Sequence, residues 1–479
     1  MTRPKTRLDE SQSGTAEPFP AYDELLQRVP EYDRFPRVDE LEAATSKLVA
    51  ASPAVRAWQC GVSAHGHPLR CLEVGNGPRR ALLLGFVHPE EPVGSLVIEE
   101  LLPLLAETGL ADELGFRFSV LKTLDPDAAR LNEPWFDRPD DLSNFVLHVY
   151  RSAYVDQPVW NFPVAYRRYR FAAPPPETRA AMAIIDREPL DFIMSLHNCS
   201  FGGGYFYLSD HDPQLLAGLA ATRRAAGVPP HRGEPEQPYL RSVGDAMYAD
   251  IRVADEYEHL ARYGHDPLTK LAAGADSDEY AIRRWGSCAM VAEVPAFAST
   301  RVADTSPAGV TRAEAKLGGI EREQEHVEFL RRCLPALRAA APEGQPWRRA
   351  VEGYLSDAAI ELPAEARQAR TEPAFAHEAS VAQSFDSLHL RELHALCRVG
   401  QFVRAADEAL KTGGAAQGGE LAALREAAEQ RVRTRVAVIQ TETGIAPVPI
   451  RRRVQMQLGA LLVALDFVRE RLPARRHGS

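Results

Sequence analysis

The sequence lacks several features that would place it in a specialised class of protein. Its six cysteines are scattered over 479 residues, without a Cys-x-x-Cys pair. Such sparse cysteine indicates a reducing compartment rather than a disulfide-bonded, secreted protein. No run of about eighteen consecutive apolar residues occurs, so we expect no membrane-spanning helix. The polar N-terminus also has no apolar stretch of the kind that a secretory signal needs. We therefore expect a cytoplasmic protein.

Positive charge is also in deficit. The chain has 56 Lys and Arg against 66 Asp and Glu, a formal net charge of −10. This balance argues against nucleic acid or an anionic membrane as the main partner, because both are bound through an excess of basic residues. Two further motifs are missing. There is no Gly-x-Ser-x-Gly elbow of a serine hydrolase, and GNGPRR at 75–80 lacks the third glycine of a dinucleotide-binding loop.

The composition, with 45% apolar and 25% charged residues, is that of a globular protein. The length predicts two or three domains. We expect an N-terminal segment at 1–50, disordered to about residue 20 and helical afterwards. A main α/β domain is expected at 51–340. A helical region at 341–479, with a flexible linker at 411–419, is expected to pack against it without contributing chemistry.

Strand patterns alternate with helical patterns from Trp58 to about residue 300. RALLLGFV at 80–87 is a continuous apolar run, typical of a strand buried on both faces. A helical pattern at about 94–107 follows it. Further strands are expected at 116–124, 191–198 and 288–295. This alternation predicts an α/β fold with a mixed, largely parallel sheet flanked by helices, followed by an α-helical C-terminal extension.

Three of these strands end in residues that could bind a metal. His88 and Glu91 follow RALLLGFV directly, and His197 ends DFIMSLHN. Ligand sites of open α/β sheets concentrate at such strand ends. Glu293 lies inside the apolar CAMVAEVP run, where an unpaired carboxylate is costly to bury. Two histidines and a carboxylate leave an open position on zinc for water, and a second glutamate can take the proton of that water.

The same His-x-x-Glu spacing occurs at His231–Glu234 and His389–Glu392. Neither pair follows an apolar run of this kind, so we expect both to have surface roles. For His88 and Glu91 the alternative is an ordinary exposed loop between a strand and a helix.

Taken together, these segments resemble the zinc metallocarboxypeptidases of the carboxypeptidase A superfamily, which includes deacylase and amidohydrolase relatives. The resemblance covers roughly residues 55 to 305. It implies that His88, Glu91 and His197 bind one Zn²⁺ per chain and that Glu293 is the general base. TLDPDAARLN at 123–132 resembles the family's Asn-Pro-Asp segment and implies that Arg130 polarises the scissile carbonyl. Tyr280, in the stretch that leads to Glu293, is a candidate substrate contact.

One part of the family pattern is altered. Val159-Trp160 stand where the family has an Asn-Arg pair that grips the substrate's C-terminal carboxylate. The arginines at 167, 168 and 170 offer another clamp, since guanidinium groups suit carboxylates. We expect a metallocarboxypeptidase acting on a peptide. Two alternatives stay open: a zinc deacylase or amidohydrolase acting on a small N-acyl amino acid, and an inactive relative whose helical region is a binding module.

Overall fold

Residues 22–412 and 418–473 are described by a computed structural model of the chain. The disordered segment predicted before residue 20 and most of the linker predicted at 411–419 lie outside these ranges. Within them, no helix has the length and apolar character needed to cross a membrane.

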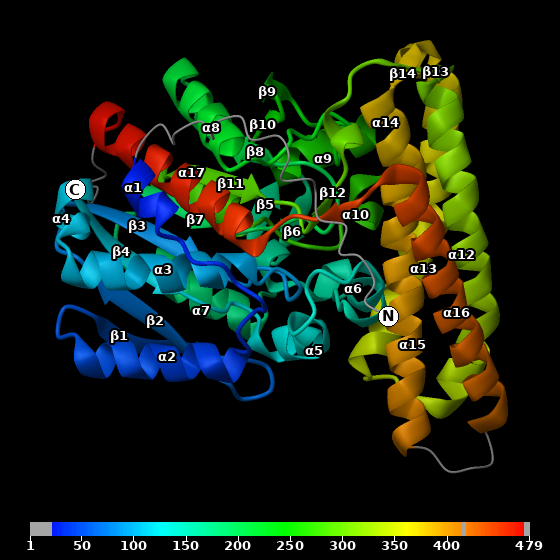
Figure 1. The fold of residues 1–479 in the computed structure, drawn as a ribbon, viewed down its shortest axis with the longest axis horizontal. Coiled ribbons are helices and arrows are strands. Elements are labelled where there is room, and N and C mark those ends of the chain that lie inside the picture. Colours follow the sequence, from blue (N-terminus) through cyan, green and yellow to red (C-terminus); the bar gives the residue numbers. More distant parts are fainter. Residues whose placement is uncertain (1–21, 413–417, 474–479) are drawn as a thin grey trace, which may run out of the picture.

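A nine-stranded mixed sheet forms the centre of the protein (Figure 1). Its strand order is β1-β2-β4-β3-β7-β11-β8-β10-β9. The bounds are β1 (Arg56–Val62), β2 (Pro68–Val74), β3 (Arg79–Leu84), β4 (Phe116–Leu121), β7 (Phe192–Ser195), β8 (Tyr205–Leu208), β9 (Ser242–Gly244), β10 (Met247–Ala249) and β11 (Cys288–Glu293). The central strands β4, β3, β7 and β11 are parallel, whereas β1, β2 and β8 join them through antiparallel pairings. The predicted mixed α/β sheet is confirmed.

Helices cover both faces of this sheet. On one face lie α3 (Val93–Glu107), α8 (Pro213–Ala225) and α17 (Ile450–Arg471), and on the other α7 (Pro176–Ile185) and α11 (Ser277–Trp285). Successive residues of β3 enter different hydrophobic clusters, Leu83 on one side and Leu82 and Leu84 on the other. Each fully buried leucine contributes about 1.5–3 kcal/mol. The strand is therefore fixed from both sides, as its continuous apolar run predicts.

Shorter elements connect these layers. The helices are α1 (Asp23–Gln27), α2 (Val38–Ala51), α4 (Leu110–Leu114), α5 (Pro126–Phe136), α6 (Leu142–His148), α9 (Val253–Arg262), α10 (Pro267–Lys270), α14 (Val381–Phe385) and the helical turns η1 (Tyr154–Asp156), η2 (Pro158–Trp160), η3 (Thr300–Ala303), η4 (Pro373–Ala376) and η5 (Asp386–Leu390). The strands are β5 (Val164–Tyr166), β6 (Tyr169–Phe171), β12 (Phe297–Ala298), β13 (Pro307–Thr311), β14 (Glu378–Ser380) and β15 (Ala446–Pro447).

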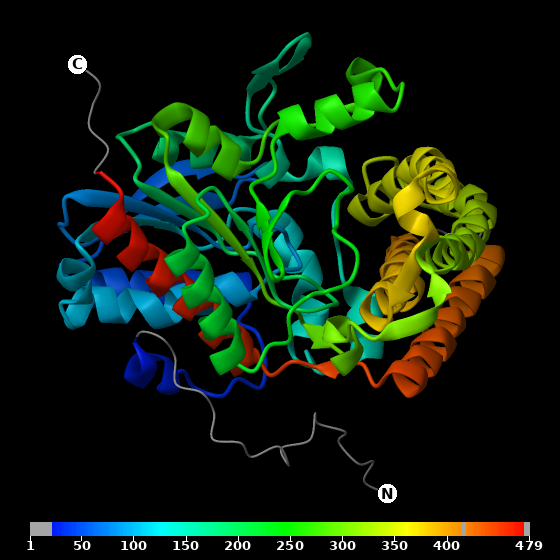
Figure 2. The ribbon, with the colours of Figure 1, turned by 90° about the horizontal axis from the view of Figure 1, so that it is seen from above.

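Four long helices form a bundle beside the sheet: α12 (Arg312–Ala340), α13 (Pro346–Thr371), α15 (Arg391–Thr412) and α16 (Gly418–Thr443). In both views the bundle stands next to the sheet rather than over one of its faces (Figures 1 and 2). It begins at Arg312, well before the domain boundary that the sequence suggested at residue 340.

After the bundle the chain returns to the sheet, where the last helix, α17, lies against α3 and α8 (red in Figure 1). Its apolar residues, Val454, Leu458, Leu461 and Leu465, are fully buried there. The side-chain amide of Gln457 donates hydrogen bonds to the backbone oxygens of His197 (2.5 Å) and Ala292 (3.0 Å). The C-terminal helix is therefore part of the α/β core, and it supports the backbone beside two predicted site residues.

Candidate metal centre

The structure brings His88, Glu91 and His197 together at the carboxyl ends of the neighbouring strands β3 and β7. One potential ligand atom from each residue lies within 4.8 Å of the others, and all three side chains are buried. Glu91 stands between the two rings. Its Oε1 lies 2.8 Å from Nδ1 of His88, and its Oε2 lies 2.9 Å from Nδ1 of His197. Three side chains of types that bind zinc therefore converge on one point.

The backbone around the cluster has little freedom. A Cβ on Gly85 would lie 2.4 Å from the carbonyl oxygen of Lys122, so only glycine fits where the chain leaves β3. The next residue, Phe86, has a φ of 43°, a left-handed conformation that is strained for a bulky side chain. Gly94 in the first turn of α3 is equally restricted, because its Cβ would lie 2.5 Å from Cβ of Leu196. This contact holds the loop that carries Glu91 against the end of β7.

Glu293 completes the cluster from β11, the strand beside β7. Its Oε1 lies 3.8 Å from Nδ1 of His197, and its Oε2 is buried without a hydrogen-bond partner. Burial and the nearby charge of Glu91 raise the pKa of Glu293 well above its ordinary value. A buried carboxylate oxygen without a partner is costly, so this position fits a group whose partners are a proton, water or substrate rather than the protein itself.

The two histidines differ in their electrostatic surroundings. Burial and the Arg151 guanidinium lower the pKa of His88 to about 3, so its ring is neutral at physiological pH. Burial also disfavours the charged form of His197, but the Glu91 carboxylate outweighs this effect and raises the pKa to about 9. Burial opposes ionisation of Glu91 as well, yet the two histidines hold its pKa below the ordinary value. Glu91 is thus ionised, as a metal ligand must be.

These residues fit a zinc ion. The donor set is two imidazoles and one carboxylate, and an unpartnered carboxylate oxygen of Glu293 lies in the same buried cluster. Two hydrogen bonds of His88 must change if its Nδ1 binds the metal, because Nδ1–H now donates to Glu91 and Nε2 accepts from Trp160. The indole N–H of Trp160 donates to Nε2 of His88 over 3.0 Å. A neutral ring that binds metal through Nδ1 carries its hydrogen on Nε2, so Trp160 has to move from this position.

The raised pKa of His197 predicts that zinc uptake depends on pH. Below pH 9 this ring carries a proton that must leave before its nitrogen can bind metal. We expect the apparent zinc affinity to weaken by about tenfold or more for each pH unit of acidification below that value. Competition with a chromophoric chelator of known pH dependence, between pH 6.5 and 8.5, measures this slope. An affinity that does not change with pH would contradict the assignment of His197 as a ligand.

Arg130 does not reach this cluster. Asp125 caps α5 through the backbone N–H of Ala128, so the helix begins at Pro126 and Arg130 lies on its outer side. There the guanidinium pairs with Asp39 over 2.7 Å. The sequence-based role of Arg130 is therefore not supported by its position, because its charge is directed toward α2.

The arginine that does reach the cluster is Arg151, which sequence reasoning missed. Its Nη1 lies 2.6 Å from Glu90 and 3.6 Å from Glu91, and its Nη2 lies 3.4 Å from Nε2 of His88. Arg151 comes from the irregular segment between α6 and η1. No motif marks it, because its long side chain, and not its place at a strand end, brings it to the site.

Other predicted contacts also lie elsewhere. The hydroxyl of Tyr280 bonds to the carboxylate of Asp186 at 2.9 and 3.1 Å, and its ring packs on Phe162. Arg167 pairs with Glu258 over 2.7 Å. Tyr280 and Arg167 therefore have partners outside the cluster, and the substrate contact and the arginine clamp stay predictions.

The surface roles expected for the two other His-x-x-Glu pairs are wrong in part. His231 is buried, and Glu234 forms an ion pair with Arg312 over 2.6 Å. Glu392 is buried inside the bundle, where Arg435 grips both of its oxygens at 2.7 and 2.9 Å. Burial of the Glu392 carboxylate is tolerated because it has a guanidinium partner.

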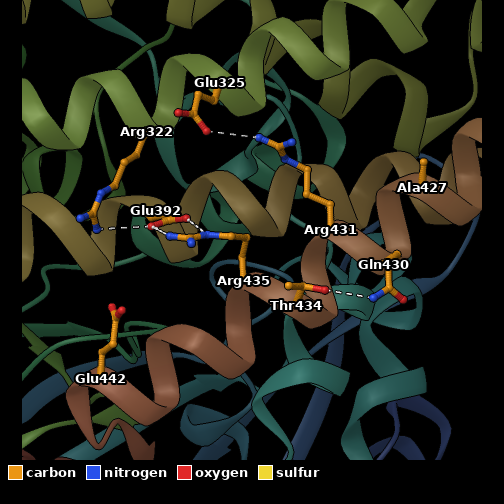
Figure 3. Close-up of a pocket in the computed structure, with 9 residues that line it drawn as sticks. All are labelled: Arg322, Glu325, Glu392, Ala427, Gln430, Arg431, Thr434, Arg435 and Glu442. Atoms are coloured by element: carbon orange, nitrogen blue, oxygen red, sulfur yellow. Dashed lines mark hydrogen bonds and ion pairs between the residues drawn. The ribbon is translucent and has the colours of Figure 1, made fainter.

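The bundle carries a hollow of about 610 Å³ whose lining is mostly charged (Figure 3). It is lined by Arg322, Glu325, Glu392, Ala427, Gln430, Arg431, Thr434, Arg435 and Glu442. Glu392 bonds to Arg435 and lies 3.5 Å from Arg322, and Glu325 lies 3.7 Å from Arg431 (dashed lines in Figure 3). These ion pairs belong to the packing of the bundle, so we assign this hollow no binding role.

Comparison with solved structures finds zinc carboxypeptidase-type folds. The chain is similar to a metallo-carboxypeptidase from Burkholderia cenocepacia (13% identity, TM-score 0.32, covering 54% of this chain and 60% of that chain). It is also similar to carboxypeptidase A from Helicoverpa armigera (14%, 0.36, 55% and 65%). A third is a metallo-carboxypeptidase from Pseudomonas aeruginosa (14%, 0.31, 54% and 60%).

This chain therefore spans less than two thirds of the length of these proteins. No family model and no curated protein matches it. Structural similarity to the carboxypeptidase A family is thus found over about 55% of the chain, at low identity. At such low scores it carries no argument about activity, and the candidate site rests on the contacts described above.

Proposed function

We propose that this protein is a zinc-dependent hydrolase that cleaves a peptide or amide bond in the manner of a metallocarboxypeptidase. One observation carries the proposal. Three adjacent parallel strands, β3, β7 and β11, deliver a buried His-Glu-His set and an unpartnered carboxylate to a single point. Because no protein group among the described residues partners Oε2 of Glu293, this oxygen is free to exchange a proton with water or substrate.

His88, Glu91 and His197 would hold the zinc. When bound, zinc supplies Lewis-acid chemistry, which makes water more acidic and polarises a carbonyl group. Glu293 takes the proton of the attacking water and delivers it to the leaving nitrogen, a role that fits its raised pKa. Arg151 takes the place proposed for Arg130, since its guanidinium lies beside the cluster and can stabilise negative charge on the substrate oxygen.

A second candidate within the same chemistry is a deacylase or amidohydrolase that acts on a small N-acyl amino acid. It is favoured by Trp160, whose indole lies against His88 where the family pattern has an arginine. An aromatic ring at this place offers an apolar contact to an acyl group rather than a charge to a carboxylate.

A substrate panel tests both candidates. The zinc-loaded full-length protein is incubated with a mixture of short peptides and N-acyl amino acids, with and without a chelator, and the products are identified by mass spectrometry. We expect amide-bond cleavage that stops with the chelator and returns when zinc is added back. Cleavage from the C-terminal end of peptides supports the carboxypeptidase, and release of acyl groups supports the deacylase. The absence of chelator-sensitive cleavage in the whole panel would favour the inactive binding protein.

A further inference from the structure

The helix α15 of the bundle lies against the segment that carries Arg151. Gly400 makes the closest approach, since a Cβ there would lie 2.1 Å from the carbonyl oxygen of Val146 in α6. Gln401 then donates a hydrogen bond to the carbonyl oxygen of Arg151 over 2.9 Å. The bundle is thus fixed directly to the backbone of the arginine whose guanidinium reaches the metal cluster.

The same face of α15 presents Arg398 and His394 next to this contact. Residues four positions apart lie above one another on a helix. Nη1 of Arg398 lies 3.4 Å from the carbonyl oxygen of Arg151 and 3.1 Å from Oε1 of Gln401. The His394 ring packs edge-on against Phe201, at 4.9 Å between ring centres. Phe201 comes four residues after His197, and the charges of Arg151 and Glu90, beside the metal cluster, act on the Arg398 guanidinium.

Arg398 differs from the other arginines of α15 because it has no carboxylate partner among the described residues. Arg391 bonds to Glu323 and Glu365, and Arg404 pairs with Asp407. The contacts of Arg398 are instead two neutral oxygens and the ring of Tyr354, 5.8 Å from its guanidinium carbon. Within residues 22–412 and 418–473, its Nε and Nη2 groups have no hydrogen-bond acceptor. A planar guanidinium with free donors is suited to bind a carboxylate through two hydrogen bonds.

The electrostatic surroundings agree with this geometry. Burial and the positive charge of Arg151 lower the pKa of Arg398, so an added anion would relieve repulsion between the two guanidiniums. Burial and the charges of Arg398 and Arg151 lower the pKa of His394 to about 3, which leaves its ring neutral and able to donate one hydrogen bond. His394 nevertheless keeps an exposed surface, through which its ring can contact a ligand.

We propose that Arg398, assisted by His394, binds the carboxylate of the substrate, so that the helical bundle determines which substrates the metal site receives. The inference rests on the proposed function for the reaction, but it assigns the anion-binding group to a helix outside the α/β domain. It also replaces the arginine that is missing at Val159-Trp160. A substrate with a free C-terminal carboxylate would bind Arg398 while its last amide bond lies toward Glu293.

Equilibrium binding tests the inference without turnover. The probes are N-benzoyl dipeptides with varied side chains, each in two forms, the free acid and the C-terminal amide. They are offered to the zinc-loaded Glu293→Gln protein, and retention after ultrafiltration is measured by mass spectrometry. We expect the acids to bind better than the amides by about 10- to 100-fold, the range of a hydrogen-bonded charge pair. Arg398→Gln should bring this ratio close to one, and Arg398→Lys should restore it in part.

Arg404→Gln is the matched control, because it removes an arginine of the same helix that is already paired with Asp407. It should keep the preference for acids. Zinc content and the unfolding temperature show whether each variant is folded. An unchanged acid preference in a folded Arg398→Gln protein, or no preference in the parent, would overturn the inference.

Turnover of the wild type separates this inference from the proposed function. Equal cleavage of acids and amides would leave the hydrolase standing and remove the role of Arg398. Selective binding of acids through Arg398 without any cleavage would keep the role of Arg398 and contradict the proposed hydrolase.

Discussion

Glu293→Gln is expected to lower turnover by at least about 100-fold while the protein keeps its zinc, because general acid–base catalysis contributes about 10²- to 10⁴-fold. The substitution preserves the shape of the side chain and removes its ability to take a proton. It should not disturb the fold, since Oε2 of Glu293 has no hydrogen-bond partner that the amide would break. Steady-state kinetics with the best substrate of the panel, together with metal analysis, measure both quantities.

A matched control is Glu177→Gln, another buried glutamate, which lies on α7 and accepts a hydrogen bond from the backbone N–H of Ala64. Its amide oxygen can accept the same hydrogen bond, so activity should be nearly unchanged. A Glu293→Gln protein that loses activity less than a few-fold would show that another group takes the proton. The metal site itself would not be affected by that result.

His88→Ala and His197→Ala are expected to abolish stable zinc binding. Each change removes one of three protein ligands, and loss of an outer-shell partner alone typically costs 10- to 100-fold in metal affinity, so loss of a ligand should cost more than about 100-fold. Zinc per chain, measured after dialysis against a weak chelator, should fall from about one to near zero. Turnover should disappear with it.

His211→Ala serves as the control for the loss of an imidazole. In the part of the chain that the structure describes, the His211 ring bonds to the carbonyl oxygen of Leu208 over 3.1 Å and is not among the candidate ligands. This variant should keep its zinc. If both cluster variants kept full metal content, the metal would be bound elsewhere and the assignment of ligands would be wrong.

The part of the site that the sequence predicted is the part carried by strand ends. His88, His197 and Glu293 each end or follow an apolar strand, and adjacent parallel strands bring their carboxyl ends to the same edge of a sheet. The pattern of apolar residues therefore predicted both the fold class and the edge of the sheet at which the site residues meet. It also located the ends of β3 and β7 closely enough to select the residues that follow them.

The rest of the site depends on contacts that no local pattern encodes. Arg130 sits in a segment that resembles a family motif, but the cap of α5 by Asp125 turns it toward Asp39. Arg151 reaches the cluster from an irregular loop through the length of its side chain. Arg398 comes from a different part of the chain altogether, and its place follows from the packing of Gly400 on α6.

The packing of the helical region also could not be predicted from local sequence patterns. Amphipathic patterns at 311–340, 388–411, 419–440 and 450–472 predict four helices, which correspond to α12, α15, α16 and α17, whereas no such pattern is assigned to α13. Periodicity gives the apolar face of a helix but not its partner. It did not reveal that α17 returns to the sheet, where Gln457 bonds to the backbone of His197. We therefore expect a protein that ends before α17 to lose support for the metal site.

The most direct test of the account is the location of the metal. Crystals of the zinc-loaded protein are measured at X-ray energies above and below the zinc absorption edge, and an anomalous difference map locates the ion. The account predicts one peak per chain, bound by His88, Glu91 and His197 at about 2.0–2.2 Å, with Glu293 beside it but not bound. A peak on other residues, or no peak among these three in zinc-saturated crystals, would contradict it.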